Sequence, residues 1–445
     1  MAYFNITGLH LSKINEYMNM DLFKRADWIA TTNIYEVNIR QYTPEGSFSA
    51  FAKNLPRLKD MGVEVLWLMP IHPIGKINRK GSLGSYYSIS DFKGVNPEFG
   101  TPADLKKLVG LAHESGMKVI MDWVANHAAW DNIWTTDHPE YFARDPDGHF
   151  IPPYDWTDVI QIDHTNTGQQ DAMIDAMTYW VTEFDIDGFR ADLAHLTPLD
   201  FWKKARTAIE PLKSNLFWLA ESEEIGYHEV FDATFTWEWM HITENFYKGN
   251  VGISALYEVL AGYRTGFPEQ AHRMYFTSNH DENTWNGTGN EKYGDMLKAL
   301  VVFSCTWNGM PMIYSGEELP NAKRLPFFEK DPISWANTCE LHDFYKTLLF
   351  LKKTNSALRS ADPAVSTFHV LTEGSKNMMA FLRKNEQHEV LVFLNLGNKP
   401  VGFLIKDRLI GGDYHNVFEK TTDQLSEDSF LKMKPWHFLV YERKK

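Results

Sequence analysis

Short apolar segments rich in Val, Ile, Phe and Tyr recur along most of the chain, with helix-like segments such as 51–61 and 103–115 between them. Strands that read as continuous apolar runs and alternate with helices are typical of a parallel sheet covered by helices. The candidate strands lie at 34–39, 63–68, 118–124, 186–192, 216–221, 230–235, 274–279 and 311–315. Eight strands, each followed by a helix, predict an α/β fold built on a (β/α)8 barrel, the TIM barrel.

Two segments interrupt this alternation. The first follows the third strand and is rich in Trp, Pro, Asp and Gly, and so long a loop in a compact domain is usually functional. We interpret it as a short inserted domain over the barrel mouth. After Asp362 and Pro363, alternating apolar segments predict an antiparallel β-sandwich. The expected division is a barrel over 1–127 and 164–362, an inserted domain over 128–163 and a C-terminal all-β domain over 363–445.

Bulk properties exclude several classes of protein. The net charge of −14 disfavours a nucleic-acid partner, which would select a basic face. No run of 18 apolar residues is present, so we expect no membrane span. The N-terminal residues lack a basic start and a long apolar run, which predicts no signal peptide. Together with only two cysteines, this favours a cytoplasmic location, while the oligomeric state stays open.

Polar residues end four of the candidate strands. Active sites of such barrels lie at the C-terminal ends of the strands. The third strand leads to Asp122, Asn126 and His127, the fourth carries Arg190 and Asp192, the fifth ends at Glu221, and the seventh leads to His280 and Asp281. Several acids in one concave site raise the free energy of ionising each, an arrangement that acid–base chemistry uses.

A structural interpretation of each residue competes with the functional one. An Asp at a strand end is more often a helix cap, and an Arg-x-Asp pair is more often a structural ion pair. Arg190 and Asp192 share one face of a strand, where a charge costs free energy unless it is paired or used. The convergence of four strands on one rim favours a site.

These motifs together resemble the four sequence regions of the α-amylase family, glycoside hydrolase family 13. They appear in the order of that family, and the resemblance runs from about Ile34 to Glu318. The segments at 85–101 and 309–318 agree with it. The four motifs are D-W-V-A-N-H at 122–127, G-F-R-A-D-L-A-H at 188–195, A-E-S-E-E at 220–224 and S-N-H-D at 278–281.

The resemblance implies a retaining glycoside hydrolase that cleaves α-1,4-glucosidic bonds in maltooligosaccharides, starch or related α-glucans. It implies that Asp192 is the nucleophile, that Glu221 is the general acid and base, and that Asp281 holds sugar hydroxyls. The substrate-binding residues implied are Tyr87, which would stack under the sugar ring, and Arg190, His127 and His280. Arg190 would keep Asp192 ionised, while Glu221 would stay protonated.

Alternative functions remain open within and beyond this chemistry. A transglycosylase or isomerase would use the same covalent intermediate with a different acceptor, and α-1,6-active or cyclodextrin-active enzymes also share the motifs. A non-catalytic binding homologue would be expected to have damaged acids, and all three acids are present here.

The resemblance also bears on metals. The chemistry needs no cofactor, but some members of the family bind Ca²⁺. Asn126 matches one ligand position, whereas Gln161 stands where an aspartate is common and Asp163 follows two residues later. The loop after the first strand has no acidic cluster, so a second calcium site is predicted to be absent. Calcium therefore remains possible, with no ligand set assigned.

Overall fold

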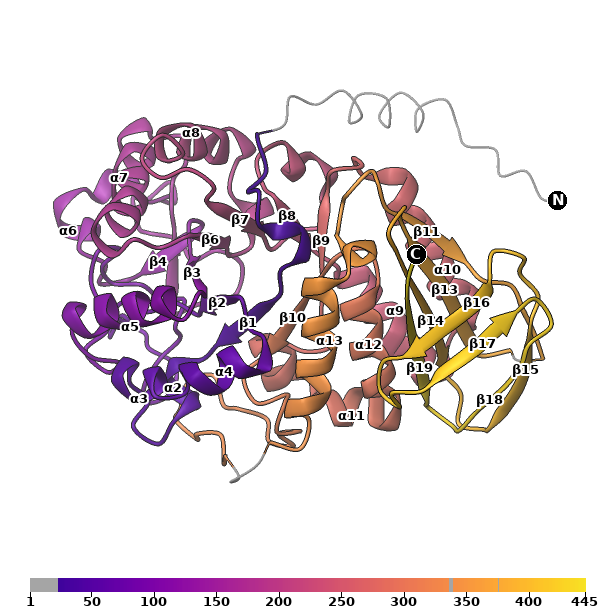
Figure 1. The fold of residues 1–445 in the computed structure, drawn as a ribbon. Coiled ribbons are helices and arrows are strands. Elements are labelled where there is room, and N and C mark those ends of the chain that lie inside the picture. Colours follow the sequence, from indigo (N-terminus) through magenta and orange to yellow (C-terminus); the bar gives the residue numbers. More distant parts are fainter. Residues whose placement is uncertain (1–22, 336–338, 375) are drawn as a thin grey trace.

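A computed structural model describes residues 23–335, 339–374 and 376–445, and it confirms the predicted barrel (Figure 1). Eight parallel strands close into a ring in the order β1-β10-β9-β8-β7-β6-β3-β2. Their bounds are β1 Ile34–Val37, β2 Val65–Leu68, β3 Lys118–Trp123, β6 Gly188–Ala191, β7 Phe217–Ala220, β8 Ala233–Phe235, β9 His272–Tyr275 and β10 Met310–Tyr314.

Helices surround the barrel, and in the described part of the chain seven of them run at least ten residues. The longer helices are α5 Pro102–Glu114, α7 Thr167–Phe184, α8 Leu199–Ile209, α9 Trp237–Tyr247, α10 Ile253–Gly266, α12 Leu297–Thr306 and α13 His342–Thr354. The shorter ones are η1 Ile29–Thr31, α2 Ile39–Tyr42, α3 Phe48–Ala52, α4 Leu55–Met61, η3 Ala194–Leu196, η5 Glu282–Asn286, α11 Gly289–Tyr293, η6 Gly294–Met296 and η7 Ser356–Leu358.

Two details differ from the sequence prediction. Only the short 3-10 helix η4 (Ile225–Glu229) lies between β7 and β8, because the few residues between these strands cannot form a helix as long as the barrel. The strand β9 begins at His272 and ends at Tyr275, whereas the sequence predicted a strand over 274–279. Its first two residues are polar and have partners in Ser360 and Glu223, so an apolar pattern does not detect them.

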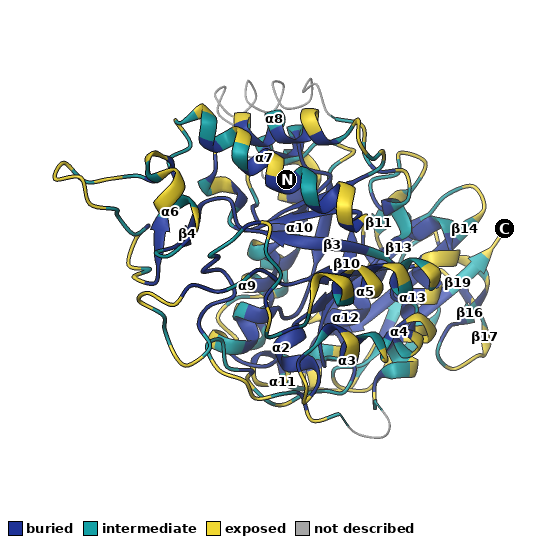
Figure 2. Cartoon of the chain, turned by 90° about the vertical axis from the view of Figure 1, so that its left-hand side faces the viewer, coloured by how far each residue is buried: buried dark blue, intermediate teal, exposed yellow. Residues whose placement is uncertain are grey.

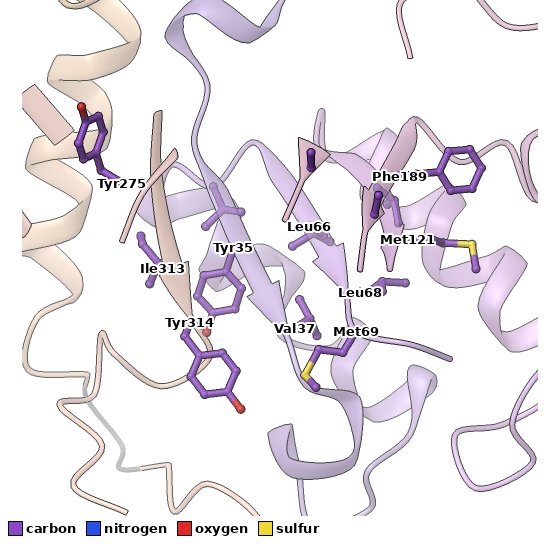
Figure 3. Packing of buried hydrophobic residues seen from close by; sticks show 14 of the residues in the cluster. Tyr35, Val37, Leu66, Leu68, Met69, Met121, Phe189, Tyr275, Ile313 and Tyr314 are labelled. Atoms are coloured by element: carbon purple, nitrogen blue, oxygen red, sulfur yellow. The ribbon is translucent and has the colours of Figure 1, made fainter. Parts of the chain in front are cut away.

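The alternation of side chains along the strands produces two buried layers. One layer fills the barrel interior, and Ile34, Trp67, Ile120, Leu219 and Met274 belong to it. The intervening residues of the strands point outward and pack against the helices, as the labelled residues Tyr35, Leu66, Leu68, Phe189 and Ile313 do (Figure 3). Figure 2 shows the barrel strands buried, whereas the outer sides of the surrounding helices and many loops are exposed. This interior apolar layer forms the floor of the barrel, and the polar residues at the rim lie directly above it.

One glycine is required where two barrel strands approach closely. Gly188 opens β6 with φ of 151°, and a Cβ atom there would lie 1.9 Å from the carbonyl oxygen of Phe217 on β7. Any other residue would push the two strands apart. Because β6 carries Arg190 and Asp192, and β7 leads into Glu221, this contact sets how closely these three side chains meet.

The segment between β3 and α7 contains a small two-stranded antiparallel sheet. It pairs β4 (His127–Ala129) with β5 (Val159–Gln161), and the short helices α6 (Trp134–Asp137) and η2 (Pro139–Tyr141) lie between them. The segment is therefore less irregular than the sequence suggested. Its extent as a domain stays a prediction.

Two antiparallel sheets close the chain and enclose a third apolar cluster, which includes Leu391, Phe393 and Phe403. In Figure 1 they lie beside the barrel, next to α12 and α13. The six-stranded sheet has the order β11-β13-β14-β19-β16-β17, and the three-stranded sheet β12-β15-β18. The bounds are β11 Ser366–His369, β12 Thr372–Glu373, β13 Met378–Lys384, β14 His388–Asn395, β15 Val401–Ile405, β16 Gly411–Asn416, β17 Thr422–Ser426, β18 Phe430–Met433 and β19 Phe438–Lys444.

Within the described ranges, no helix is both long enough and apolar enough to cross a membrane. The prediction that the chain has no signal peptide concerns residues 1–22, which lie outside the described part.

Candidate active site

The candidate site is a polar layer on top of the apolar barrel floor. Strand alternation explains its position. Glu36 and Asp122 lie two residues beyond the inward-facing Ile34 and Ile120, so they face inward as well. Arg190 is paired in register with Asp122 and faces the same way. Asp192 comes directly after β6, two residues beyond Arg190, and Glu221 comes directly after β7, two residues beyond Leu219, so both continue the inward-facing side of their strands. A single face of the strand ring thus delivers these charges to one place.

Arg190 lies at the centre of this layer and is fully buried. Its Nη1 donates to Asp122 Oδ1 at 2.7 Å and to Asp192 Oδ1 at 2.9 Å. Its Nη2 lies 2.8 Å from Glu221 Oε2, an ionic contact whose angles do not suit a hydrogen bond. The guanidinium also lies 4.9 Å from the ring centre of Trp67, which favours a cation. Arg190 therefore bridges the two predicted catalytic carboxyls.

This bridge changes the role inferred for Arg190. The sequence suggested that it ionises Asp192 selectively, but its terminal nitrogens lie at similar distances from the two carboxyls, 2.9 Å from Asp192 and 2.8 Å from Glu221. Burial raises the pKa of both carboxyls, Arg190 lowers both, and the nearby carboxylate of Asp281 raises both again, with the net shift upward. Two buried acids on one cation disfavour each other's ionisation, so burial and Asp281 together favour a protonated form of the pair.

A strained turn links the two carboxyls through the backbone. Leu193 directly follows Asp192 and has φ of 39°, a left-handed conformation that a leucine rarely adopts. Its amide N–H donates to Glu221 Oε2 at 2.7 Å, and the N–H of Ala194 donates to the carbonyl oxygen of Glu221 at 3.2 Å. The strain thus fixes the position of the Glu221 carboxyl relative to Asp192.

A histidine flanked by two carboxyls forms the opposite side of the layer. His280 Nδ1 lies 2.5 Å from Glu36 Oε1, and its Nε2 lies 3.2 Å from Asp281 Oδ2. Burial alone would lower the pKa of His280, but Asp281 and Glu36 raise it well above its usual range. Burial conversely raises the pKa of Asp281, but His280 lowers it to a net value below its usual range. The two carboxyls thus favour the protonated form of His280, and His280 in turn favours the ionised form of Asp281.

Tyr87 connects the histidine to the arginine. Its hydroxyl lies 3.0 Å from Asp122 Oδ2 and 2.8 Å from His280 Nε2. It donates its one proton to Asp122 and accepts from the imidazolium. Since Asp122 also accepts from Arg190 and from Trp67 Nε1 at 3.1 Å, the network is continuous from one side of the site to the other.

His127 differs from His280 in charge. Burial lowers the pKa of His127 to about 4, so the ring is neutral at pH 7. Asn126 Nδ2 donates to His127 Nδ1 at 3.2 Å, which leaves the ring proton on Nε2. Gln161 Nε2 fixes that orientation of Asn126 by donating to its Oδ1 at 3.1 Å.

The same contacts bear on calcium. Gln161 Nε2 also donates to the carbonyl oxygens of Asn126 and Ile162, at 3.1 and 3.3 Å. The side-chain oxygen of Asn126, the one residue that the resemblance matches to a calcium ligand, thus already accepts from an amide, and with Gln161 in this orientation the position does not fit a cation. Among the residues that the structure describes, no group of three or more His, Cys, Asp or Glu side chains is arranged to hold a metal.

A pocket of about 370 Å³ opens above the polar layer, within the size range of small-ligand sites. It brings together five of the predicted residues, namely Tyr87, His127, Asp192, Glu221 and Asp281. Arg190 and His280 lie behind this wall and hold the carboxyls, so the predicted contact of these two side chains with a sugar stays a prediction. The remaining lining residues are Lys80, Ser85, Trp156, Asp158, Val159, Leu193, Trp285, Phe327 and Phe328.

The sequence prediction missed two groups of residues. Glu36 lies inside the apolar strand β1, and its only sequence signal is a charge on the same strand face as Ile34. The aromatic rim around Trp285 and the Lys80–Asp158 ion pair of 2.8 Å come from loops that meet only in the fold.

The closed barrel with three carboxyls in one rim pocket defines a barrel-type glycoside hydrolase. Residues 21–159 and 154–367 match the family model described as alpha amylase, catalytic domain. The chain thus belongs to the alpha-amylase family, and the resemblance inferred from its motifs is confirmed.

Similar proteins agree with this assignment. The chain is 24% identical to alpha-amylase 2 of Dictyoglomus thermophilum, over 92% of this chain and 77% of that protein. It is 24% identical to a cyclomaltodextrinase of Geobacillus thermopakistaniensis, over 85% of this chain and 71% of that protein. A solved structure of a maltogenic alpha-amylase from Thermotoga neapolitana matches with a TM-score of 0.86 and 29% identity, covering 94% of this chain and 99% of the other.

Proposed function

We propose that the protein is a retaining hydrolase that cleaves α-1,4-glucosidic bonds in maltooligosaccharides and related α-glucans. The observation that carries this proposal is that Asp192 and Glu221 lie on the two terminal nitrogens of one guanidinium and face one pocket together with Asp281. Carboxyls held so close suit retention, which needs a separation of about 5–5.5 Å, more than inversion, which needs about 6.5–9.5 Å.

The first step forms a glycosyl-enzyme. A carboxylate oxygen of Asp192 attacks the anomeric carbon while the bond from that carbon to the glycosidic oxygen breaks. Glu221 gives its proton to the leaving oxygen, which departs as a free hydroxyl. Burial and the nearby Asp281 raise the pKa of Glu221, which favours the protonated form that a general acid needs, but they raise the pKa of Asp192 as well, so these shifts do not choose between the two carboxyls.

The second step returns the enzyme to its first state. Glu221, now ionised, takes a proton from water, and the resulting oxygen nucleophile forms a bond to the anomeric carbon while the bond to Asp192 breaks. Asp281, kept ionised by His280, accepts hydrogen bonds from sugar hydroxyls, and the neutral His127 donates through Nε2. If a sugar hydroxyl replaces water, the same intermediate yields transglycosylation.

A product profile tests this function. The enzyme is incubated with maltoheptaose, pullulan and β-cyclodextrin, the products are separated by size, and the anomeric signals are followed by NMR. We expect products shorter than maltoheptaose, released first as α-anomers. Products longer than maltoheptaose would identify a transglycosylase, and panose from pullulan would place the specificity nearer to neopullulanase. A β-anomer as first product would contradict the retaining mechanism.

Glu36 is a positioning residue in this scheme, and Glu36→Gln tests it. The titratable groups around His280 are Glu36, Asp281, Tyr87, Asp122 and Glu221. Removing the charge of Glu36 lowers the pKa of His280, so the imidazolium is lost at a lower pH. We expect kcat/KM to fall by about tenfold relative to the wild type at a fixed alkaline pH, where His280 is neutral in the variant and still charged in the wild type, and the two enzymes to converge at lower pH.

Glu317→Gln is the matched control for this experiment. Glu317 is also buried near the barrel rim, and burial raises its pKa to about 8, but it is not among the groups that set the charge of His280. Its amide variant should therefore keep the wild-type ratio of kcat/KM between alkaline and neutral pH. An unchanged profile in Glu36→Gln would show that Glu36 does not set the charge of His280.

A further inference from the structure

A second acid follows Glu221 in the loop after β7. Glu223 lies two residues further on, and its carboxylate accepts three hydrogen bonds. Oε1 accepts from the Tyr263 hydroxyl at 2.7 Å and from Arg273 Nη2 at 3.1 Å, and Oε2 accepts from the backbone N–H of Glu238 at 2.8 Å. The three donors belong to α10, β9 and α9. Glu223 therefore ties the loop that carries Glu221 to three separate elements of the barrel.

The N-terminal end of α9 explains why a carboxylate suits this position. The first turn of a helix leaves backbone N–H groups without partners inside the helix, and the helix dipole favours a negative charge there. Thr236, at the N-cap of α9, makes no side-chain cap. Glu223 accepts from the N–H of Glu238 instead, and the Tyr263 hydroxyl accepts from that of Trp239 at 3.1 Å. The loop after β7 thus takes the place of a helix cap.

Arg273 is held in a fixed position for its contact with Glu223. Its side chain is 5% exposed, and its guanidinium centre lies 3.7 Å from the ring centre of Tyr263 and 3.8 Å from that of Phe267. Contact with two aromatic rings favours a cation at this place. Nη2 also donates to the carbonyl oxygen of Phe235 at 3.4 Å. Because this packing prevents Arg273 from following a displaced loop, its contact restricts where the Glu223 carboxylate can lie.

Glu223 stands outside the pocket, and its connection to the chemistry is the backbone. Its side chain does not line the pocket, whereas that of Glu221 does. Only Ser222 separates the two residues, so their Cα atoms are at most about 7 Å apart. Ser222 is buried, and its hydroxyl accepts from the N–H of Glu224 at 3.0 Å, which fixes the turn between the two acids. A displacement of Glu223 therefore moves Glu221.

The contacts of the Glu221 carboxyl show why its backbone position matters. Oε2 accepts from the N–H of Leu193 and lies next to the guanidinium of Arg190. An oxygen that already faces a donor and a cation is a poor place for a proton, so the proton that Glu221 transfers belongs on Oε1. Both contacts act on Oε2, and the direction of Oε1 therefore depends on where the backbone holds Glu221.

We propose that Glu223 is a positioning residue for proton transfer: by holding the loop after β7 against α9, α10 and β9, it keeps Glu221 where Oε1 can protonate the leaving oxygen. The proposal rests on the proposed function, in which Glu221 is the general acid. It differs from a purely structural role, because a misplaced acid slows the reactions that need its proton and spares those that do not. A shift of about 1 Å at a catalytic group can cost about 10²-fold in rate.

Two substrates that differ in their leaving group test this role. Maltoheptaose needs a proton on its leaving oxygen, whereas α-maltosyl fluoride loses fluoride without one. Both are compared by kcat/KM, which covers the steps up to the glycosyl-enzyme. In Glu223→Ala we expect kcat/KM to fall by at least about tenfold on maltoheptaose and by less than about threefold on α-maltosyl fluoride. A general loss of folded enzyme would lower both values by the same factor.

Three further variants make the result specific. Tyr263→Phe keeps the ring against Arg273 but removes one donor, so it should show the same selectivity with a smaller loss, about threefold on maltoheptaose. Glu223→Gln should recover part of the activity, because its amide oxygen can still accept from Arg273. Glu224→Ala removes the exposed neighbouring acid, which does not line the pocket, and should keep the wild-type values on both substrates.

Equal losses on the two substrates in Glu223→Ala, or no loss on either, would overturn the proposal, and so would a selective loss of the same size in Glu224→Ala. If Glu223→Ala does not fold, the ratio in Tyr263→Phe decides, and an unchanged ratio there overturns the proposal. Glu221→Gln separates these results from a failure of the proposed function. It should show the largest preference for the fluoride, because it lacks the acid altogether. If it loses equally on both substrates, or the wild type does not cleave maltoheptaose, the proposed function itself is wrong.

Discussion

Replacement of Asp192 by asparagine is expected to reduce kcat on maltoheptaose by about 10⁴-fold, measured by release of reducing ends. The amide keeps the size of the carboxylate, and its oxygen can still accept from Arg190 Nη1, but it is too weak a nucleophile to form the glycosyl-enzyme. Arg190 keeps its contacts with Asp122 and Glu221 in this variant, so no buried cation is left unpaired. The unfolding temperature should therefore stay close to that of the wild type.

Asp171→Asn is the matched control for Asp192→Asn. It removes an exposed carboxylate on α7 that pairs with Lys204, and it should leave both kcat and the unfolding temperature unchanged. If Asp192→Asn retains more than about a tenth of wild-type activity, Asp192 is not the nucleophile, because a mechanism with a covalent intermediate cannot reach that rate without its nucleophilic carboxylate.

The sequence predicted the residues of the site better than their contacts. Strand periodicity and the four motifs placed Asp122, Arg190, Asp192 and Glu221 at one rim, and the structure brings them within one network. The motifs could not show that Arg190 bridges two acids, because its Nη2 contact depends on the packing of β6 against β7. The consequence for proton sharing is therefore a structural result.

Glu36 could have been identified as a site residue from the alternation of side chains along its strand. A charge in the apolar run of β1 poses the same question as Arg190 in β6, because each lies on the inward face of a barrel strand. Asking for its partner would have pointed to a cation at the rim, which is His280. The motifs did not raise the question, since Glu36 lies outside them.

The Lys80–Asp158 ion pair could not be predicted in the same way. Lys80 and Asp158 lie in two loops far apart in sequence, and each alone reads as an exposed turn residue. Their contact follows from how the segment between β3 and α7 lies over the barrel, which depends on long-range packing. Chemistry fixed by strand alternation is thus predictable here, whereas pocket walls built from loops need the fold.

Replacement of Glu221 by glutamine is expected to reduce kcat on maltoheptaose by about 10³-fold, within the range for loss of a general acid and base. The loss should depend on the leaving group, because an amide cannot supply a proton to a glycosidic oxygen. Fluoride departs without protonation, so α-maltosyl fluoride should still form the glycosyl-enzyme on Asp192. The second step still lacks its base, and the intermediate should accumulate.

This variant therefore separates the two carboxyls that Arg190 holds together. With α-maltosyl fluoride, Glu221→Gln should release a burst of fluoride equal to the enzyme concentration and gain the mass of one maltosyl unit on the peptide containing Asp192. Asp192→Asn should show neither the burst nor the added mass, although it retains the proton of Glu221. A burst in Asp192→Asn, or its absence in Glu221→Gln, would mean that the nucleophile and the acid have been exchanged. Equal distances to one guanidinium do not distinguish the two carboxyls, so the dependence on the leaving group is the property that assigns their roles.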